Sequence, residues 1–200
     1  MSSSAELIQK LRSMTGAGIL DCKAALDTSK DDLEKAVQYL REKGIASAVK
    51  KAERAAKQGL VTSYIHAGGL LGVLVEVNCE TDFVARTDDF QNLVKQIAMQ
   101  VAAANPLYVQ RTDIPQEVID KEREIYKVQL KEEGKPEQVW PKIMDGKLEK
   151  YYSQVCLIDQ PHIRDAAGKE KIKDLITNAI AKIGENIVVR RFSRFRVGEE

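Results

Sequence analysis

Apolar residues recur every three or four positions in several segments of the chain, which predicts amphipathic helices. One such pattern begins after Thr87, a helix-capping residue, and stops at Asn105-Pro106, where a helix cannot continue. Another covers 172–183 and is followed by Gly184, a residue typical of helix C-caps. Both patterns are long and regular enough to predict helices at 87–104 and 172–183.

Two further helical segments lie in the middle of the chain. The segments 115–132 and 136–152 each begin with a proline, and Gly134 lies between them. This arrangement predicts a helical hairpin over about 115–152. Trp140 is expected to be a packing anchor of the second helix, although a half-exposed position is the alternative.

Apolar and β-branched residues predict three strands, at 60–66, 70–77 and 187–197. The first two are joined by the glycine-rich loop 67–69, which favours a hairpin and therefore an antiparallel sheet. The helices at 87–104 and 172–183 are available to cover one face of this sheet. The other face carries Leu70 and Leu74, or else their opposite-parity neighbours, with Phe192 or Phe195 beside them. In either case it is more apolar than a fully solvated face should be.

The N-terminal residues 1–45 predict a small three-helix bundle. The first helix ends at the loop Thr15-Gly16-Ala17-Gly18, the second covers about 19–26, and the third is capped from Ser29 and closed by Gly44. Residues 46–58, rich in Ala, Lys, Glu and Arg, predict a helical linker to a core domain at 59–200. The predicted fold class is therefore α+β: a bundle similar in shape to a ubiquitin-associated domain, a helical linker, and a three-stranded antiparallel sheet with helices on one face.

The strand at 70–77 ends at a corner with the sequence NCETDFVAR, residues 78–86. Thr81 followed by Asp82 is a helix-start signal, because a Thr oxygen caps free backbone N–H groups and a first-turn carboxylate interacts favourably with the helix dipole. Phe83 lies one step past this corner, where loops hold functional groups on a rigid scaffold. The pattern leaves two interpretations of Phe83 open, because a phenylalanine at a helix start is either a surface anchor or, more commonly, a core residue.

Composition mainly excludes classes of function. The chain has 44% hydrophobic and 30% charged residues and a formal net charge of +1, which does not favour wrapping nucleic acid or binding an anionic membrane. No apolar segment approaches the roughly 20 residues of a membrane span, and no signal-peptide pattern precedes the first helix. We therefore expect a protein that binds another protein and that is cytoplasmic, or lies in an organelle after losing a presequence.

The residues that usually carry catalysis or metal binding are few and dispersed. Cys22, Cys79 and Cys156 are far apart and form no CxxC motif, so we interpret them as small buried hydrophobic residues. His66 and His162 are separated by almost a hundred residues and indicate no catalytic group. We expect no catalytic residue, no metal site and no cofactor, and hence no enzyme.

Three separated segments carry a family resemblance: LRSMTGAGILDCKAAL at 11–26, NCETDFVAR at 78–86 and IGENIVVRRFSRF at 183–195. In this order they closely resemble elongation factor Ts, the guanine nucleotide exchange factor of elongation factor Tu. The resemblance covers residues 5–197 and is thin between Asp113 and Glu149. It implies a partner, elongation factor Tu in its GDP-bound and nucleotide-free forms, with no direct contact to nucleic acid or membrane.

The resemblance also implies the residues that contact the partner. The corner would insert into the G domain as a unit and disturb its Mg²⁺ site, through Thr81, Asp82, Phe83 and Val84. The loop of the bundle would contact the same domain near the base site, through Arg12, Thr15, Gly16, Ala17 and Gly18. From the residues alone, the two glycines of this loop are explained equally well by a tight turn.

Three other functions compete with nucleotide exchange. A ubiquitin-associated-type adaptor would use the bundle and leave the corner idle. An RNA-binding strand would use the arginines of 190–196 with Phe192 and Phe195, but acidic residues elsewhere cancel the net charge. A carboxylate or metal enzyme built from Glu76, Glu80 and Asp82 is weaker still, because helix capping explains acidic residues at a turn.

The apolar sheet face predicts self-association. The resemblance implies that longer members of the family cover this face with a second copy of the sheet domain, and a chain of 200 residues has no room for one. We therefore expect a homodimer in which two sheets pack face to face. The competing expectation is that residues 115–152 fold back over the sheet of a monomer.

Overall fold

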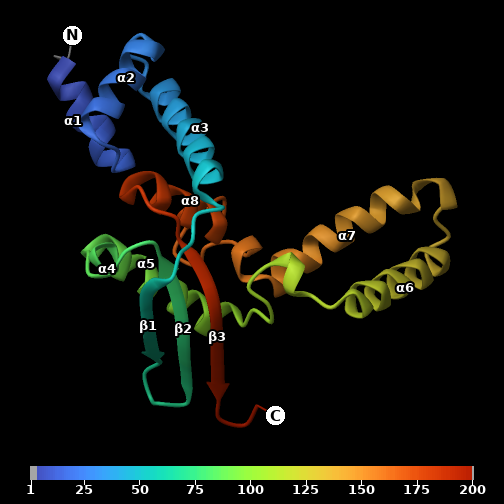
Figure 1. The fold of residues 1–200 in the computed structure, drawn as a ribbon. Helices are drawn as coiled ribbons and strands as arrows, with labels where there is room; N and C mark the ends of the chain where they lie inside the picture. Colours follow the sequence, from blue (N-terminus) through green and yellow to red (C-terminus); the bar gives the residue numbers. More distant parts are fainter. Residues whose placement is uncertain (1–3, 200) are drawn as a thin grey trace. The chain divides into compact units, whose positions relative to one another are not determined.

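The computed structural model describes residues 4–199, and the chain divides into two compact units. One unit comprises the chain up to Val61 with Val77–Val94 and Asp174–Val189, and the other comprises Thr62–Glu76, Lys95–Lys173 and the chain from Arg190 on. Among the described residues there are eight α-helices and a three-stranded antiparallel sheet (Figure 1). The predicted α+β class is confirmed.

The first three helices are α1 (Ser4–Thr15), α2 (Ile19–Ser29) and α3 (Leu33–Lys51). They share a hydrophobic core of small and branched side chains, made of Leu11, Cys22, Ala25, Leu26 and Ala36. The side chain of Asp32 accepts a hydrogen bond from the backbone N–H of Lys35 at 3.1 Å and so caps α3. The prediction that Ser29 caps the third helix is wrong, because Ser29 is the last residue of α2.

The sequence predicted that the third helix ends at Gly44, but this prediction is wrong, because α3 continues beyond it. Gly44 is buried, and a Cβ atom at this position would lie 3.2 Å from the Cβ of Ala181 in α8 (Ile172–Ile183). The absence of a side chain at this glycine therefore allows the two helices to pack closely, and it does not mark a helix end. Because α3 continues to Lys51 and β1 begins at Gln58, the expected helical linker 46–58 is helical only in its first part.

The sheet is built from β1 (Gln58–Ile65), β2 (Leu71–Cys79) and β3 (Val188–Arg196), in the order β1-β2-β3. The hairpin between β1 and β2 is closed by a hydrogen bond from the N–H of His66 to the carbonyl of Leu71 at 2.9 Å. The antiparallel pairing of β3 with β2 extends to Val197, whose N–H donates to the carbonyl of Leu70 at 2.9 Å. On the same register, Arg191 pairs with Glu76 through an ion pair of 2.7 Å.

Alternate residues of β2 have opposite environments. Val73, Val75 and Val77 are buried, whereas Leu70, just before the strand, and Leu74 remain 63% and 49% exposed. On β3 the exposed aromatic is Phe195, at 70%, while Phe192 is half-buried. The apolar side chains on this face line a shallow hollow, and they are Ile65, Leu70, Leu74, Phe195 and Val197.

Helix α5 (Asp88–Ala104) has the boundaries that the sequence predicted. The Thr87 hydroxyl accepts a hydrogen bond from the N–H of Phe90 at 3.3 Å, which caps the first turn. The stripe that includes Phe90 and Ile97 is fully buried. At the end of α8, Gly184 adopts a φ of 92° and its N–H donates to the carbonyl of Ile180 at 2.9 Å, as expected for a C-cap.

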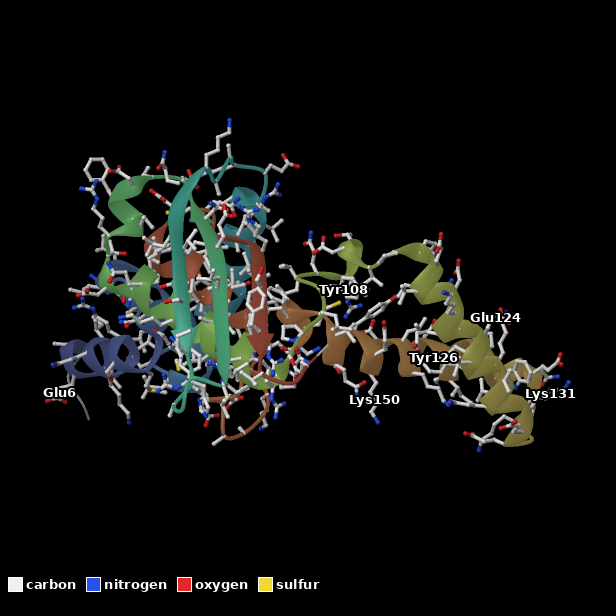
Figure 2. The ribbon with its side chains drawn as sticks, turned by 90° about the horizontal axis from the view of Figure 1, so that it is seen from below. Glu6, Tyr108, Glu124, Tyr126, Lys131 and Lys150 are labelled. Carbon is white, nitrogen blue, oxygen red and sulfur yellow. The ribbon has the colours of Figure 1, made fainter. Side chains whose placement is uncertain are left out.

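The remaining long helices, α6 (Gln116–Glu132) and α7 (Trp140–Val155), lie side by side (Figure 1). Tyr126 extends from α6 towards α7 and packs against the cluster that contains Ile119 and Leu148 (Figure 2). The second helix begins at Trp140, after a 3₁₀ turn at Glu137–Val139. Trp140 is half-buried, and its indole N–H donates to the carbonyl of Lys135 at 2.8 Å.

Two further 3₁₀ turns, Arg111–Asp113 and Leu157–Asp159, flank the helix pair. They are joined where Arg111 pairs with Asp159 and with Glu149 of α7. These ion pairs connect the turn before α6 to α7 and to the turn that follows α7.

Candidate functional site

The corner after β2 forms a single helical turn, α4 (Asp82–Ala85). Its N-cap is Thr81, whose hydroxyl accepts a hydrogen bond from the N–H of Val84 at 3.3 Å, as the sequence predicted. Asp82 lies in the first turn and pairs with Arg86 at 2.7 Å. The acidic residue therefore contributes to local helix structure through both the helix dipole and this ion pair.

Phe83 points away from the protein, with 77% of its surface exposed. Ala85, two residues later, is buried and attaches the same turn to the core. Of the two interpretations that the sequence left open for Phe83, the structure therefore supports the exposed one. A large apolar side chain held outward by a short, capped helix is typical of a contact with another molecule.

The end of β2, next to the corner, is buried. Cys79 is fully buried, and its thiol lies 3.1 Å from the carbonyl of Thr81. Burial raises the pKa of this thiol to about 11, so the group stays protonated and acts as a small apolar residue. Cys22 and Cys156 are also buried and free, as the sequence predicted.

The loop between α1 and α2 contains two glycines in different conformations. Gly16 has a φ of 68°, in the left-handed region, and its N–H donates to the carbonyl of Arg12 at 2.8 Å. A turn therefore explains Gly16. Gly18 has a φ of −63°, which any residue adopts, and a Cβ there would meet only the Asp21 side chain at an ordinary 3.5 Å.

The other residues implied for this loop have distinct environments. Arg12 is exposed, Thr15 is half-buried, and the Thr15 hydroxyl donates to the carbonyl of Leu11 at 2.8 Å. Ala17 packs against the core of the bundle. Gly18 is thus the one loop glycine whose lack of a side chain is not required by the backbone, which leaves room there for a close approach by another surface.

Exposed apolar residues beside this loop were missed by the sequence analysis. Leu20, the second residue of α2, is 82% exposed, and Met14 and Ile19 are also exposed. The exposure of Leu20 could have been predicted from its position, because it lies outside the apolar stripe of α2. The buried residues of that stripe are Cys22, Ala25 and Leu26. Loop and corner therefore each present apolar surface that the fold itself does not bury.

The arginines of β3 have local partners. Arg191 pairs with Glu76, and Arg194 and Arg196 both pair with Glu199. Arg194 also donates to the carbonyl of Ala102 at 3.3 Å. These contacts account for three of the four arginines through the fold and reduce the case for an RNA-binding strand.

Within residues 4–199, no group of three or more His, Cys, Asp and Glu side chains is arranged to hold a metal ion. In the same part of the chain, no helix combines the length and apolarity that crossing a membrane requires. The acidic residues of the corner are engaged in hydrogen bonds within the protein, and Glu80 accepts one from the N–H of Asn186 at 2.7 Å.

An α+β chain that holds an exposed aromatic residue on a capped helical turn and exposed apolar residues beside a helix–helix loop belongs to the class of proteins whose surface is suited to binding another protein. Comparison with known proteins defines the family. The family model for elongation factor TS matches residues 4–169. The chain is 58% identical to elongation factor Ts of Thermotoga neapolitana, over 100% of both chains.

Two more relatives agree. Elongation factor Ts of Thermodesulfovibrio yellowstonii is 57% identical over 100% of this chain and 98% of its own. Elongation factor Ts of Thermoanaerobacter sp. strain X514 is 57% identical over 98% of this chain and 95% of its own. The chain belongs to the elongation factor Ts family, and its function is that of a translation elongation factor.

Proposed function

We propose that the chain binds elongation factor Tu in its GDP-bound form and promotes the release of GDP, without making or breaking a covalent bond. The observation that carries this proposal is the exposure of Phe83 on a capped helical turn whose neighbour Ala85 is buried. Thr81, Asp82, Phe83 and Val84 would enter the G domain as one unit and disturb its Mg²⁺ site. The chain then acts as an exchange factor and not as an enzyme.

The free energy needed to release the nucleotide requires more than one contact between the chain and its partner. A nanomolar nucleotide complex is held by about 12 kcal/mol, whereas burying one phenylalanine side chain contributes about 2 to 3 kcal/mol. Exchange becomes fast only when the factor stabilises the nucleotide-free state, because the coupling between the two binders is reciprocal. Phe83 therefore acts together with other surfaces.

The loop of the N-terminal bundle is the second proposed contact, through Arg12, Thr15, Gly16, Ala17 and Gly18. Its exposed neighbours Ile19 and Leu20 supply the apolar area that such a contact needs. The absence of a side chain at Gly18 allows the partner's backbone to approach closely. The bundle that we propose to be of ubiquitin-associated type would bind a partner through the same loop.

The exposed sheet face is the third proposed interface, formed with a second copy of this chain. Its hollow is lined by Ile65, Leu70, Leu74, Phe195 and Val197. At the centre lies Gly72, where an added Cβ would meet the Cδ1 of Ile65 at 3.0 Å. Gly72 therefore lets the Ile65 side chain lie close against the strand, and the large apolar side chains of this face stay exposed. Monomers seldom leave such a patch in contact with water, so we propose a two-fold homodimer that carries two copies of the partner.

The proposed partner is elongation factor Tu in its GDP-bound and nucleotide-free forms, with no direct contact to nucleic acid or membrane and no cofactor. We place the protein in the cytoplasm, since its proposed partner takes part in translation there.

The experiment that tests the exchange proposal is the release of labelled GDP from purified elongation factor Tu. At substoichiometric amounts the wild-type chain should accelerate release, and alone it should neither bind nor hydrolyse guanine nucleotide. Release that is equally fast with and without the chain contradicts the proposal.

A further inference from the structure

The loop after α8 holds the corner through a single carboxylate. Glu185 Oε2 accepts hydrogen bonds from the backbone N–H groups of Glu80 and Thr81, both at 3.0 Å. Glu185 Oε1 accepts a third hydrogen bond, from the Thr81 hydroxyl at 2.7 Å. More than a hundred residues of sequence separate the two segments that this carboxylate joins.

The connection runs in both directions. Glu80 Oε1 accepts a hydrogen bond from the N–H of Asn186 at 2.7 Å, so each segment supplies a glutamate to the backbone of the other. The Asn186 side chain donates from Nδ2 to the carbonyls of Ala52 and Arg54, at 3.2 and 2.8 Å. Asn186 is buried, and Arg54 also approaches Glu80 at 3.5 Å. Three segments, at 52–54, 80–81 and 185–186, are thereby tied together.

The Thr81 hydroxyl depends on this carboxylate for its orientation. It donates its proton to Glu185 and accepts from the N–H of Val84, so one group serves both the anchor and the helix cap. Hydrogen bonds in such a chain strengthen one another, and those to a charged acceptor are the stronger ones. A helix of four residues does not persist by its own hydrogen bonds, so α4 needs an external constraint of this kind.

We infer that Glu185 is a positioning residue for the exchange corner: its carboxylate fixes the direction in which α4 presents Phe83. This inference rests on the proposed function only in the statement that Phe83 enters the partner. The anchoring itself is a property of the free chain and is measured there.

The exchange assay compares Glu185→Ala with Glu185→Gln. The amide oxygen of Gln can still accept from both backbone N–H groups, and its NH₂ group can donate to the Thr81 oxygen, so Glu185→Gln should keep the maximal rate of GDP release within about twofold. Glu185→Ala should lower the maximal rate about tenfold, equivalent to about 1.4 kcal/mol. The concentration for half-maximal effect should change less, because the other contact surfaces remain.

Asp174→Ala is the matched control, because it removes a carboxylate from α8 that approaches Arg41 at 3.9 Å. It should leave the maximal rate unchanged, and thermal unfolding should show all three variants folded. Equal maximal rates for Glu185→Ala and the wild type would overturn the inference. A folded Glu185→Gln variant that loses as much rate as Glu185→Ala would also overturn it.

Amide hydrogen exchange of the free chain supplies a second measurement that does not depend on the partner. In Glu185→Ala the N–H groups of Glu80, Thr81 and Val84 should exchange at least about tenfold faster, while those in the middle of α5 keep their protection. Unchanged exchange at the corner would reject the anchoring role whatever the release assay gives. Failure of the wild type to release GDP, with faster amide exchange in the variant, would reject the exchange function and retain the anchor.

Discussion

Arg111 donates from Nε and Nη2 to the two carboxylate oxygens of Asp159, at 2.7 and 3.0 Å. The same guanidinium donates from Nη1 and Nη2 to Glu149 of α7 at 2.6 and 2.8 Å and lies 4.6 Å from the ring centre of Tyr152. The Asp159 side chain is almost fully buried, and Lys173 approaches it at 3.6 Å. One arginine thus joins two turns and a helix.

This arrangement predicts acid-dependent stability. Burial acts to raise the pKa of Asp159, but the hydrogen bonds and charge of Arg111 outweigh it and hold the pKa below its usual 3.8. Arg111 likewise lowers the pKa of Glu149 from its usual 4.5. Both pKa values are lower in the folded state than in the unfolded state. The two ionised carboxylates therefore contribute fully to the free energy of unfolding at any pH above their unfolded-state pKa values. This contribution is lost as the pH falls through their folded-state pKa values, below about pH 4.

Asp159→Asn should therefore lower the free energy of unfolding at pH 7 by about 1 to 3 kcal/mol. Between pH 7 and pH 3, the free energy of unfolding of this variant should fall by less than that of the wild type. Urea unfolding at several pH values measures both effects. Glu124→Gln is the control, since Glu124 is exposed and pairs only on the surface with Lys127. An equally steep pH dependence in Asp159→Asn and the wild type would contradict the prediction.

Phe83→Ala should slow GDP release from elongation factor Tu by about 30-fold or more, the equivalent of about 2 kcal/mol of lost burial in the partner. Its unfolding free energy should change by less than about 0.5 kcal/mol, because an exposed side chain leaves no internal cavity. Phe90→Ala is the matched control: Phe90 is fully buried, so its loss should cost about 3 to 5 kcal/mol of stability. A core-like loss of stability in Phe83→Ala would show that Phe83 packs within the chain.

Asp82→Asn should reduce GDP release less than Phe83→Ala does. Asp82 pairs with Arg86 within the same helical turn, so most of its effect is on the corner's local structure. An exposed ion pair of this spacing contributes about 0.3 to 0.5 kcal/mol. Release rates of the two variants, measured at the same factor concentration, make the comparison, and a larger loss in Asp82→Asn would instead assign the carboxylate a direct role at the partner.

Gly18→Ser should raise the factor concentration needed for half-maximal GDP release about tenfold, the equivalent of about 1.4 kcal/mol, because a side chain would keep the partner away from the loop. The folded chain should be as stable as the wild type or slightly more so, since Ser is a favourable N-cap and the backbone at Gly18 is extended.

Gly16→Ala provides the contrast to Gly18→Ser. It should cost about 1 to 2 kcal/mol of folding free energy because Gly16 has a left-handed backbone. Thermal unfolding separates the two variants, and a Gly18→Ser chain with unchanged half-saturation would place the partner elsewhere.

Leu74→Glu should convert the proposed dimer to a monomer, because it places a charge in the centre of the apolar sheet face. Light scattering at micromolar concentration should give twice 22.4 kDa for the wild type and 22.4 kDa for the variant. Ile125→Glu on α6 is the matched control, since Ile125 is 48% exposed, close to the value for Leu74. A wild-type mass of 22.4 kDa rejects the dimer, and an unchanged mass for Leu74→Glu would assign the contact to another surface.

Features that depend on nearby residues could be predicted from the sequence. The span of α5 followed from its apolar stripe, the Thr87 cap and the stop at Asn105-Pro106. The end of α8 followed from Gly184. The alternation along 70–77 predicted one uncovered apolar sheet face, but the structure was needed to show that it is the face of Leu70 and Leu74. Local hydrogen bonding and side-chain periodicity act over a few residues, so a single sequence carries their signals.

Features in which distant segments meet could not be predicted from the sequence and became apparent in the folded chain. Gly44 continues α3 because it packs against Ala181, and no local signal distinguishes that role from a helix end. Phe83 is exposed because the buried Ala85 and the carboxylate of Glu185 fix the turn that carries it. Packing and hydrogen bonds between segments more than 100 residues apart override local preference, because they depend on which surfaces the folded chain brings together.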